Sequence, residues 1–270
     1  MTSQTIRIGL SGAGGRMGGM LVNEISRADD LSLVVATDRA GSPHIGLDAG
    51  VLAAVGPKDV LLGSDPASLF YGTDVVIDFS APEASLQHAV LAAETGTAIV
   101  IGTTGLSADQ EAVLRQAATQ TAVVYCANTS VGVTLLIQLV EQVAAQLTAG
   151  WDIEILETHH HHKVDAPSGT ALALGKAAAR GRQADLDQVF DIVRNGQIGA
   201  RTEGNIGFAI LRGGDVAGEH SVIFYGESER VEIIHRANDR VIFARGALRA
   251  ARFAATAAPG FYDMHDVLKG

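Results

Sequence analysis

The 270-residue chain has one cysteine, Cys126, and few basic residues. A single cysteine can form neither an intrachain disulfide nor a cysteine-based zinc site. The 20 lysines and arginines are outnumbered by 30 aspartates and glutamates, which gives a formal net charge of −10. Because no basic patch is available to neutralise phosphates, we expect no nucleic-acid partner.

Long apolar runs are also missing. No stretch reaches the roughly eighteen apolar residues that a membrane-spanning helix needs. The chain leads almost directly into a strand-like segment, without the basic and apolar regions of a secretory signal. We therefore expect a cytoplasmic protein that does not associate with a membrane.

Glycine, by contrast, is abundant. It supplies 31 of the 270 residues, about 11% against roughly 7% in ordinary proteins. Near the start, a strand is predicted at residues 5–10, a glycine-rich turn at 11–18, a helix at about 16–28 and an apolar strand at 31–37. This order predicts a βαβ unit that opens a doubly wound parallel sheet.

The glycine spacing is typical of a dinucleotide-binding turn. Gly12 permits the tight turn, Gly15 lets the backbone approach a pyrophosphate, and Gly18 lets the helix lie close to the strand. Asp38 follows the second strand, where a carboxylate can accept hydrogen bonds from an adenosine ribose. Arg39 next to it can hold a 2′-phosphate, so NADH and NADPH both fit. The alternative is that the glycines form only a tight turn.

The strand–helix alternation continues up to residue 130. Ser80 and Ser107 are each predicted to cap a helix. The chain after each strand carries small or polar residues, near Phe79, Gly102 and Asn128, and ligands bind at the carboxyl ends of such strands. The segment from Gly102 to Gly105 could also be a simple turn. The strands themselves are predicted at residues 73–79, 97–101 and 121–125.

The second half follows a different pattern. A long helix is predicted at residues 131–147 and another at 240–257. Short glycine-containing connections separate four further predicted strands, which favours a largely antiparallel sheet. One face of that sheet could be covered by another subunit. The four strands lie at residues 189–194, 204–211, 219–225 and 229–236.

Between these parts lies a run of four histidines, residues 159–162. It follows a predicted strand at 151–156 and precedes a helix predicted after Ser168, which can act as N-cap. In an extended chain alternate side chains point to opposite faces, so the four imidazoles could not share one metal ion. We expect no metal. Part of the run can serve as proton donor, and the alternative is a run without a chemical role.

Taken together, these segments resemble the 4-hydroxy-tetrahydrodipicolinate (dihydrodipicolinate) reductase family. The stretch from Glu157 to Ala171 reads E-x-H-H-x-H-K-x-D-x-P-S-G-T-A, like that family's signature. The resemblance extends over nearly the whole chain. It includes G-A-G-G-R-M-G at residues 12–18, I-G-T-T-G at 101–105, A-N-x-S-V-G at 127–132, G-x-I-G-F at 204–208, R-x-G-D-x-x-G-E-H at 212–220 and D-M-x-D-V-L at 263–268.

The resemblance implies an NAD(P)H-dependent oxidoreductase of the diaminopimelate route to lysine, which reduces 4-hydroxy-tetrahydrodipicolinate, a small cyclic dicarboxylate. It implies a Rossmann-like dinucleotide-binding domain of residues 1–130 and 241–270. The second domain, residues 131–240, would be an α+β domain with a mixed or antiparallel sheet that binds substrate and builds a homotetramer. Another two-domain amino- or hydroxy-acid dehydrogenase, or a non-catalytic NAD(P)-sensing module, would share only the nucleotide half.

Matching positions carry the family's roles to this chain. His159 is expected to be the proton donor and Lys163 to assist it, while His161 receives no role. The threonine at position 129 stands where the family often has an aromatic residue. The substrate is expected to bind His160, Ser168, Gly169 and Thr170. The NADH or NADPH contacts are expected from Gly12, Ala13, Gly14, Gly15, Arg16, Met17, Asp38, Arg39, Gly102, Thr103, Thr104, Ala127, Asn128, Thr129 and Ser130.

Overall fold

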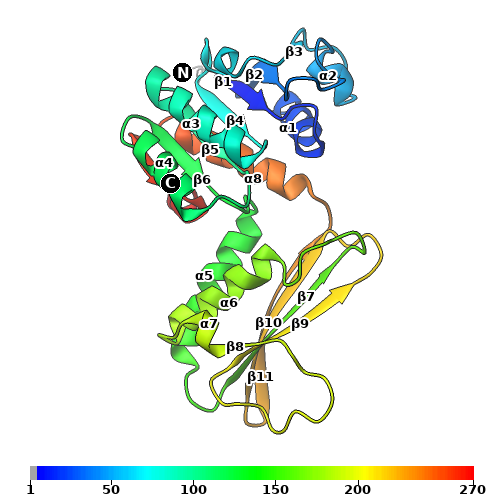
Figure 1. Ribbon diagram of the computed structural model, residues 1–270, viewed down its shortest axis with the longest axis vertical. Coiled ribbons are helices and arrows are strands. Elements are labelled where there is room, and N and C mark those ends of the chain that lie inside the picture. The colour runs from blue at the N-terminus through cyan, green and yellow to red at the C-terminus, as the bar shows by residue number, and fades with distance from the viewer. Residues whose placement is uncertain (1–4) are drawn as a thin grey trace. The chain divides into compact units, whose positions relative to one another are not determined.

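The computed structural model describes residues 5–270, which form two compact units. Unit 1 comprises the described residues up to Val131 together with Val241–Gly270, and unit 2 is Gly132–Arg240. Figure 1 shows the elements of each unit. Among the described residues, no helix has both the length and the apolar character that crossing a membrane requires.

Unit 1 is built around a parallel sheet with the strand order β12-β6-β5-β4-β1-β2-β3. Its strands are β1 Ile6–Ser11, β2 Leu31–Thr37, β3 Leu62–Gly63, β4 Val75–Asp78, β5 Ala98–Ile101, β6 Ala122–Tyr125 and β12 Gly260–Tyr262. Its helices are α1 Arg16–Ser26, α2 Ala49–Leu52, the 3₁₀-helix η1 Pro66–Phe70, α3 Pro82–Thr95, α4 Ala108–Ala117, α8 Val241–Ala254 and α9 Met264–Lys269.

Apolar residues cover both faces of this sheet. In β4, Val75 and Ile77 pack with α1 and α8, whereas Val76 packs with α3 and α4. Strands buried on both sides read as continuous apolar runs, which is why β4 and β5 were recognisable from the sequence. The predicted doubly wound parallel sheet is confirmed.

Unit 2 has a five-stranded mixed sheet with the order β11-β10-β7-β9-β8. The pairs β11–β10 and β10–β7 are antiparallel, while β7–β9 and β9–β8 are parallel. The expected α+β unit with a mixed or antiparallel sheet is thereby confirmed in its mixed form. Its elements are α5 Val131–Gln146, β7 Asp152–His159, α6 Gly169–Gly181, α7 Leu186–Val189, β8 Phe190–Asp191, β9 Ile206–Arg212, β10 Gly218–Gly226 and β11 Glu229–Ala237.

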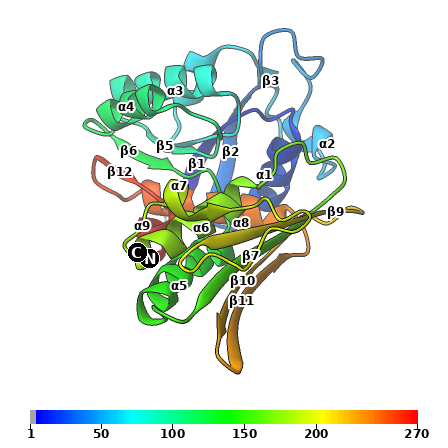
Figure 2. The ribbon, with the colours of Figure 1, turned by 60° about the horizontal axis from the view of Figure 1, so that its bottom comes forward.

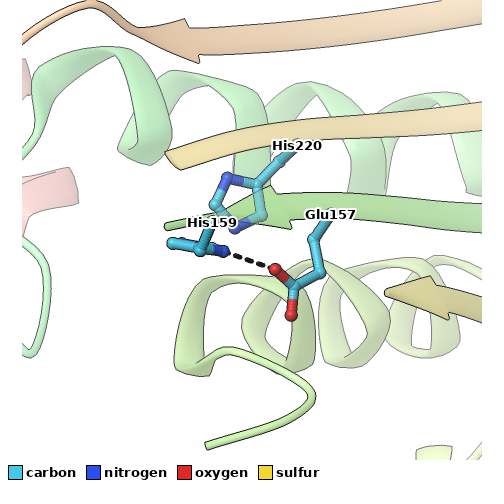
Figure 3. A group of neighbouring side chains, drawn as sticks. All are labelled: Glu157, His159 and His220. Atoms are coloured by element: carbon cyan, nitrogen blue, oxygen red, sulfur yellow. Dashed lines mark hydrogen bonds and ion pairs between the residues drawn. The ribbon is translucent and has the colours of Figure 1, made fainter. Parts of the chain in front are cut away.

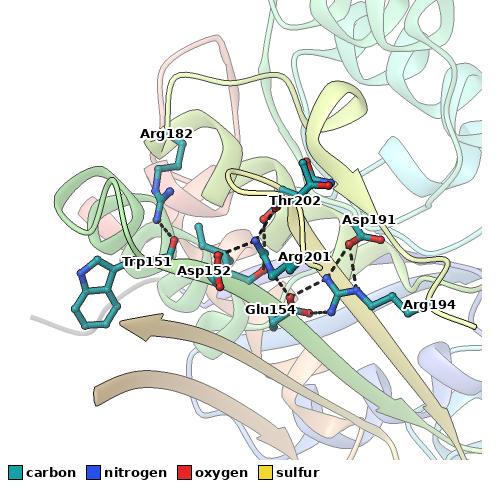
Figure 4. A network of polar contacts seen from close by, with 10 residues as sticks. Trp151, Asp152, Glu154, Arg182, Asp191, Arg194, Arg201 and Thr202 are labelled. Carbon is teal, nitrogen blue, oxygen red and sulfur yellow. Dashed lines mark hydrogen bonds and ion pairs between the residues drawn. The ribbon is translucent and has the colours of Figure 1, made fainter. Parts of the chain in front are cut away.

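One face of this second sheet packs on helices α5 and α6 (Figure 2). Its core contains Ile153, Ile155, Val222 and Phe224, all buried. Residues of β7 that alternate with these point to the other face, where Glu154 binds Arg194 and Arg201 in a polar network (Figure 4). The two faces therefore differ in chemistry: one is a closed core and the other carries charged side chains.

One predicted helix start is wrong. The N-cap of α3 is Ala81, whose side chain makes no capping bond, and Pro82 occupies the first helical position. Proline has no backbone N–H and a φ angle that already suits a helix, so the helix begins there without a serine cap. The backbone N–H of Ser80 instead donates to Thr103 Oγ1 at 3.2 Å. Ser107, by contrast, caps α4 as predicted, in a capping box with Gln110.

Candidate active site

A glutamate and a histidine occupy the buried face of β7 at its carboxyl end. The strand alternates strictly, so Glu157 and His159 continue the row of Ile153 and Ile155. Glu157 is 1% exposed and His159 is 9% exposed. Nδ1 of His159 is hydrogen-bonded to Oε2 of Glu157, as Figure 3 shows together with His220 from β10. A strand therefore places a titratable pair in a largely apolar unit.

The carboxylate of Glu157 is surrounded by donors. Arg212, at the end of β9, donates from both of its Nη atoms to the two carboxylate oxygens at 2.9 Å each. The backbone N–H of Ser168 donates to Oε1 at 3.0 Å. Burial opposes ionisation, but Arg212, His159 and the Ser168 N–H together hold the pKa of Glu157 below its ordinary value. Glu157 is therefore an ionised, fully engaged carboxylate.

The bond to Glu157 assigns separate tasks to the two ring nitrogens of His159. An ionised carboxylate only accepts, so Nδ1 carries a proton and Nε2 is the atom that can exchange one. Burial lowers the pKa of His159 and, together with the charges of Lys163 and Arg212, outweighs the opposing effect of Glu157. A histidine of lowered pKa is a stronger acid when it is protonated. The sequence-based choice of His159 as proton donor thus has a suitable environment.

Ser168 begins helix α6 as predicted. Its Oγ accepts a hydrogen bond from the Ala171 backbone N–H at 3.1 Å. The same Oγ lies 3.0 Å from Nε2 of His220. Burial lowers the pKa of His220 to about 4, so this ring is neutral at pH 7. Gly169 and Thr170 form the first turn, where the positive end of the helix dipole favours a carboxylate.

Lys163 lies in the loop after β7 and forms an ion pair with Asp165. Its Nζ is 2.7 and 2.8 Å from the two Asp165 oxygens. The lysine lowers the pKa of Asp165. The backbone carbonyl of Asp165 accepts from Arg212 at 2.8 Å, so this loop is tied to the Glu157 cluster. Lys163 is therefore a cation in the loop that leads to α6 and can meet an anionic ligand.

The histidine run does not stay extended beyond His159, so the expected alternation over all four residues is wrong. The chain turns at residues 161 and 162, and the rings of His161 and His162 approach to 3.8 Å between centroids. Nδ1 of His161 is bonded to the carbonyl of Gly214 at 2.8 Å. His160 is half-buried, and burial followed by the charge of Arg240 lowers its pKa. The alternation of side chains ends with β7 at His159, and the other three histidines belong to the loop that follows.

Three potential metal ligands nevertheless lie together, since ligand atoms of Glu157, His159 and His220 are within 4.8 Å of one another. The bidentate guanidinium of Arg212 already occupies both carboxylate oxygens. A fixed positive charge at that point opposes binding of a cation. The arrangement therefore favours proton transfer.

The glycine-rich turn of unit 1 has the shape of a phosphate-binding loop. Gly12 has a φ of +76°, and a Cβ added to it would lie 2.4 Å from the Phe79 carbonyl oxygen. Gly15, the N-cap of α1, has no side chain to cover the first-turn N–H groups. Ala13 joins the turn to the end of β2 through a 3.0 Å bond to the Thr37 carbonyl. The backbone N–H groups of Arg16 and Met17 lie in the first turn of α1 and can therefore bind a phosphate.

Asp38 lies directly beside this turn. A Cβ on Gly14 would lie 2.2 Å from Oδ2 of Asp38, so only glycine fits there without a shift of the carboxylate. Oδ1 accepts from the Arg39 backbone N–H at 2.8 Å and Oδ2 from Ser42 Oγ at 2.7 Å. Both oxygens retain lone pairs for a ribose. The Arg39 side chain is exposed.

The residues after β5 and β6 lie at the same carboxyl edge, but some of their side chains are already used. Thr103 is buried and bonds Ser85 Oγ at 2.8 Å. Thr129 is buried and its hydroxyl donates to the Phe243 carbonyl at 2.7 Å. A cofactor contact at these two positions would fall to the backbone. Thr104 and Ala127 are exposed, Gly102 and Ser130 are buried, and Asn128 is half-buried with its Oδ1 accepting the Ser130 N–H at 2.9 Å.

Sequence reasoning missed three participants: Glu157, Arg212 and His220 received no role. Glu157 stands two residues before His159, a spacing that puts both on one strand face, and this signal was available. Arg212 and His220 belong to the R-x-G-D-x-x-G-E-H segment. Nothing local in that segment indicates that both ends meet β7.

A doubly wound sheet with a glycine-rich turn and an acid after its second strand, joined in one chain to a buried glutamate–histidine pair, defines an NAD(P)-dependent oxidoreductase. Family models agree. The one described as dihydrodipicolinate reductase, N-terminus, matches residues 6–129, and the one described as dihydrodipicolinate reductase, C-terminus, matches residues 132–268. The chain belongs to the dihydrodipicolinate reductase family, as the motifs indicated.

Individual proteins show the same relationship. The 4-hydroxy-tetrahydrodipicolinate reductase of Rhizobium meliloti is 52% identical over 269 residues, which cover 99% of each chain. That of Ruegeria pomeroyi is 51% identical over 259 residues, or 96% of each chain.

The fold of this chain is similar to that of several solved structures. A dipicolinate-bound dihydrodipicolinate reductase from a Paenisporosarcina species has a TM-score of 0.77 at 22% identity, covering 96% of this chain and 98% of its own. An amine dehydrogenase from Mycobacterium smegmatis has a TM-score of 0.65 at 12% identity, covering 95% of this chain and 94% of its own. At such identities the likeness concerns the fold alone.

Buried His220 makes stability depend on pH. Its folded-state pKa of about 4 lies below the ordinary 6.5, so the unfolded chain binds more protons between these values and acid favours unfolding. We expect His220→Gln to reduce the loss of unfolding free energy between pH 7.5 and pH 5 by about 2 kcal/mol. Urea unfolding at both pH values measures this. An unchanged loss in the variant would mean that His220 does not titrate in this range.

Proposed function

We propose that this chain catalyses the NADH- or NADPH-dependent reduction of 4-hydroxy-tetrahydrodipicolinate to tetrahydrodipicolinate, a step of the diaminopimelate route to lysine. The observation that carries the proposal is the buried Glu157–His159 pair, whose glutamate also binds the N-cap of helix α6. A proton donor at His159 would lie beside a helix N-terminus that favours a carboxylate. Relatives about half identical over nearly the entire chain support the same reaction.

Unit 1 is the proposed dinucleotide-binding domain. The turn from Gly12 to Met17 would hold the pyrophosphate, Asp38 the ribose, and Arg39 a 2′-phosphate where one is present. The segments at 102–104 and 127–130 would complete the edge at the carboxyl ends of β5 and β6. Bound nicotinamide supplies a hydride, which no side chain can provide.

Unit 2 is the proposed substrate-binding domain. A dicarboxylate needs positive charge and N–H donors, and these are offered by Lys163, by half-buried His160 and by the first turn of α6. The Ser168 N–H is engaged by Glu157, and its Oγ already contacts the Ala171 N–H and His220 Nε2. Ser168 would therefore contribute only by turning its hydroxyl proton to the substrate, with Gly169 and Thr170 supplying the rest of the turn. A substrate carboxylate at Lys163 would compete with Asp165 for the ammonium.

The 4-hydroxyl of the substrate must leave as water, which gives a conjugated carbon–carbon double bond. Reduction of that double bond then needs a hydride at one carbon and a proton at the neighbouring carbon. His159 can deliver the proton from Nε2, since Nδ1 is held by Glu157. The imidazole left behind is neutral and still bonded to the glutamate. Lys163 assists by neutralising substrate charge and by resupplying protons from the loop.

The direct test is oxidation of reduced nicotinamide that depends on the condensation product of aspartate semialdehyde and pyruvate. Steady-state rates with NADH and with NADPH should both rise with that product. If turnover occurs instead with amino or hydroxy acids, the chain is a different two-domain dehydrogenase. Nicotinamide binding without turnover of any of these would favour a sensing module.

A homotetramer in the cytoplasm is part of the proposal. The sheet face of unit 2 that faces away from α5 and α6 carries the Glu154–Arg194 network and also exposes large apolar side chains, among them Leu211 and Tyr225, 52% and 39% exposed. Such a face suits contact between subunits. Sedimentation velocity should give four times the 28.0 kDa chain mass. A monomer at micromolar concentration would contradict the tetramer.

We expect His159→Gln to lower kcat by about 10²–10⁴-fold, because glutamine cannot donate a proton to carbon. The Kd for NADPH should change little, since His159 belongs to unit 2. Stopped-flow or steady-state rates and fluorescence titration measure the two quantities. His161→Gln, an exposed neighbour, is the control and should keep its rate. Full activity in His159→Gln would show that another group is the acid.

Asp38→Ala should weaken NADH by about ten- to a hundredfold, the loss expected for hydrogen bonds to a carboxylate. NADPH should lose less, because its 2′-phosphate can use Arg39. The matched variant Arg39→Ala should show the opposite order and weaken NADPH more. Dissociation constants from fluorescence titration of both variants decide the matter, and equal losses for both cofactors in Asp38→Ala would contradict its ribose role.

A further inference from the structure

The contacts of Glu157 go beyond those of an ordinary buried ion pair. Its two oxygens receive hydrogen bonds from the catalytic-acid candidate His159, from the α6 N-cap Ser168 and from Arg212. These partners come from a strand, a helix terminus and a neighbouring strand. A carboxylate that is 1% exposed and held from three directions cannot turn away from His159.

We propose that Glu157 is the positioning residue of the proton donor, and that it fixes His159 in the one tautomer in which Nδ1 keeps its proton and Nε2 delivers one. This deepens the proposed function and rests on it. The ionised carboxylate offers only acceptor atoms. An unprotonated Nδ1 is an acceptor too, so its lone pair would be repelled by the lone pairs of the carboxylate. Arg212 and the Ser168 N–H keep Glu157 ionised and aimed, and so act on His159 through it.

Register explains how this geometry arises. His159 is paired with Arg212 across β7–β9, and Glu157 is paired with His220 across β7–β10. A Cβ on Gly218 would lie 3.1 Å from Nε2 of His159, so the absence of a side chain there leaves room around the nitrogen that is proposed to deliver the proton. In His159, Nδ1 is therefore held by Glu157, while Nε2 is not covered by a side chain at position 218.

Charged groups face His159 from each neighbouring element. Glu157 on the same strand favours the imidazolium, whereas Lys163 in the following loop and Arg212 on β9 disfavour it. The neutral His220 approaches from β10 with its ring centroid at 5.1 Å. From α6 the contact to the cluster is Ser168, which does not titrate at these pH values. Removing Glu157 or removing Arg212 should therefore move the titration of His159 in opposite directions.

The test compares Glu157→Gln with Arg212→Gln in the full-length protein. We expect Glu157→Gln to lower kcat by about tenfold or more, as loss of an orienting partner does, with a smaller change in KM. The limb of the kcat/KM profile on which activity falls with rising pH should move to lower pH. In Arg212→Gln the same limb should move to higher pH. A role of Glu157 in folding alone would leave the limb unmoved, or would move both variants the same way, and either outcome overturns the proposal.

Histidine labelled with ¹⁵N gives a readout independent of turnover. The His159 signals, assigned by their loss in His159→Gln, should report a proton on Nδ1 at neutral pH in the wild type. In Glu157→Gln they should report a mixture of tautomers or the Nε2–H form. An unchanged Nδ1–H signal would overturn the proposal. Because this spectrum needs no substrate, an inactive wild type with the expected tautomer would refute the proposed reaction and leave the role of Glu157 standing.

Discussion

The buried carboxylate of Glu157 is the constraint on which the chemistry of unit 2 depends. Taking an isolated carboxylate out of water costs several kcal/mol, and only good geometry with full hydrogen bonding offsets that cost. Here the compensation comes from Arg212, Ser168 and His159 together. The same bonds that stabilise the charge hold the proposed proton donor His159, the helix N-cap and the end of β9 in place. The Glu157 carboxylate therefore contributes both to the stability of unit 2 and to the orientation of His159.

The mixed sheet is what allows these partners to meet. Parallel pairing of β7 with β9 brings the carboxyl ends of both strands to the same edge, which sets His159 beside Arg212. Antiparallel pairing of β7 with β10 brings the start of β10 to that edge and sets His220 opposite Glu157. A wholly antiparallel sheet would direct the end of β9 to the opposite edge, away from the glutamate. The connection that makes β9 parallel is thus a requirement of the site.

Local patterns in the sequence were enough for the features that depend on neighbours in the chain. The apolar runs of β4 and β5, the glycine-rich turn and the Ser168 cap all follow from residues within a few positions of one another. The cap predicted at Ser80 failed because proline at position 82 began the helix by another local rule. The alternation predicted through His162 failed because the strand ended at His159. Both errors concern where an element stops, which competing local preferences decide.

Arg212 and His220 lay beyond local reasoning for a different reason. They are 55 and 63 residues from Glu157 in the chain, and their place beside it is set by strand register, which depends on the whole packed sheet. Motif resemblance marked their segment without indicating a partner. The contacts of Arg212 and His220 therefore depend on the whole fold, whereas the glycine-rich turn depends only on residues close together in the chain.

The electrostatics around His159 also connect binding to chemistry. Burial lowers the pKa of this imidazole, Glu157 raises it, and the cations Lys163 and Arg212 lower it further. A bound dicarboxylate would act in the same direction as Glu157, since any negative charge placed near Lys163 favours the imidazolium. Arg212 cannot respond, because Glu157 and the Asp165 carbonyl occupy its Nη atoms. The fixed ion pair of Glu157 and Arg212 thus acts on the pKa of His159, and the charge of a ligand bound near Lys163 would adjust it. A dicarboxylate substrate would itself favour protonation of the proposed proton donor.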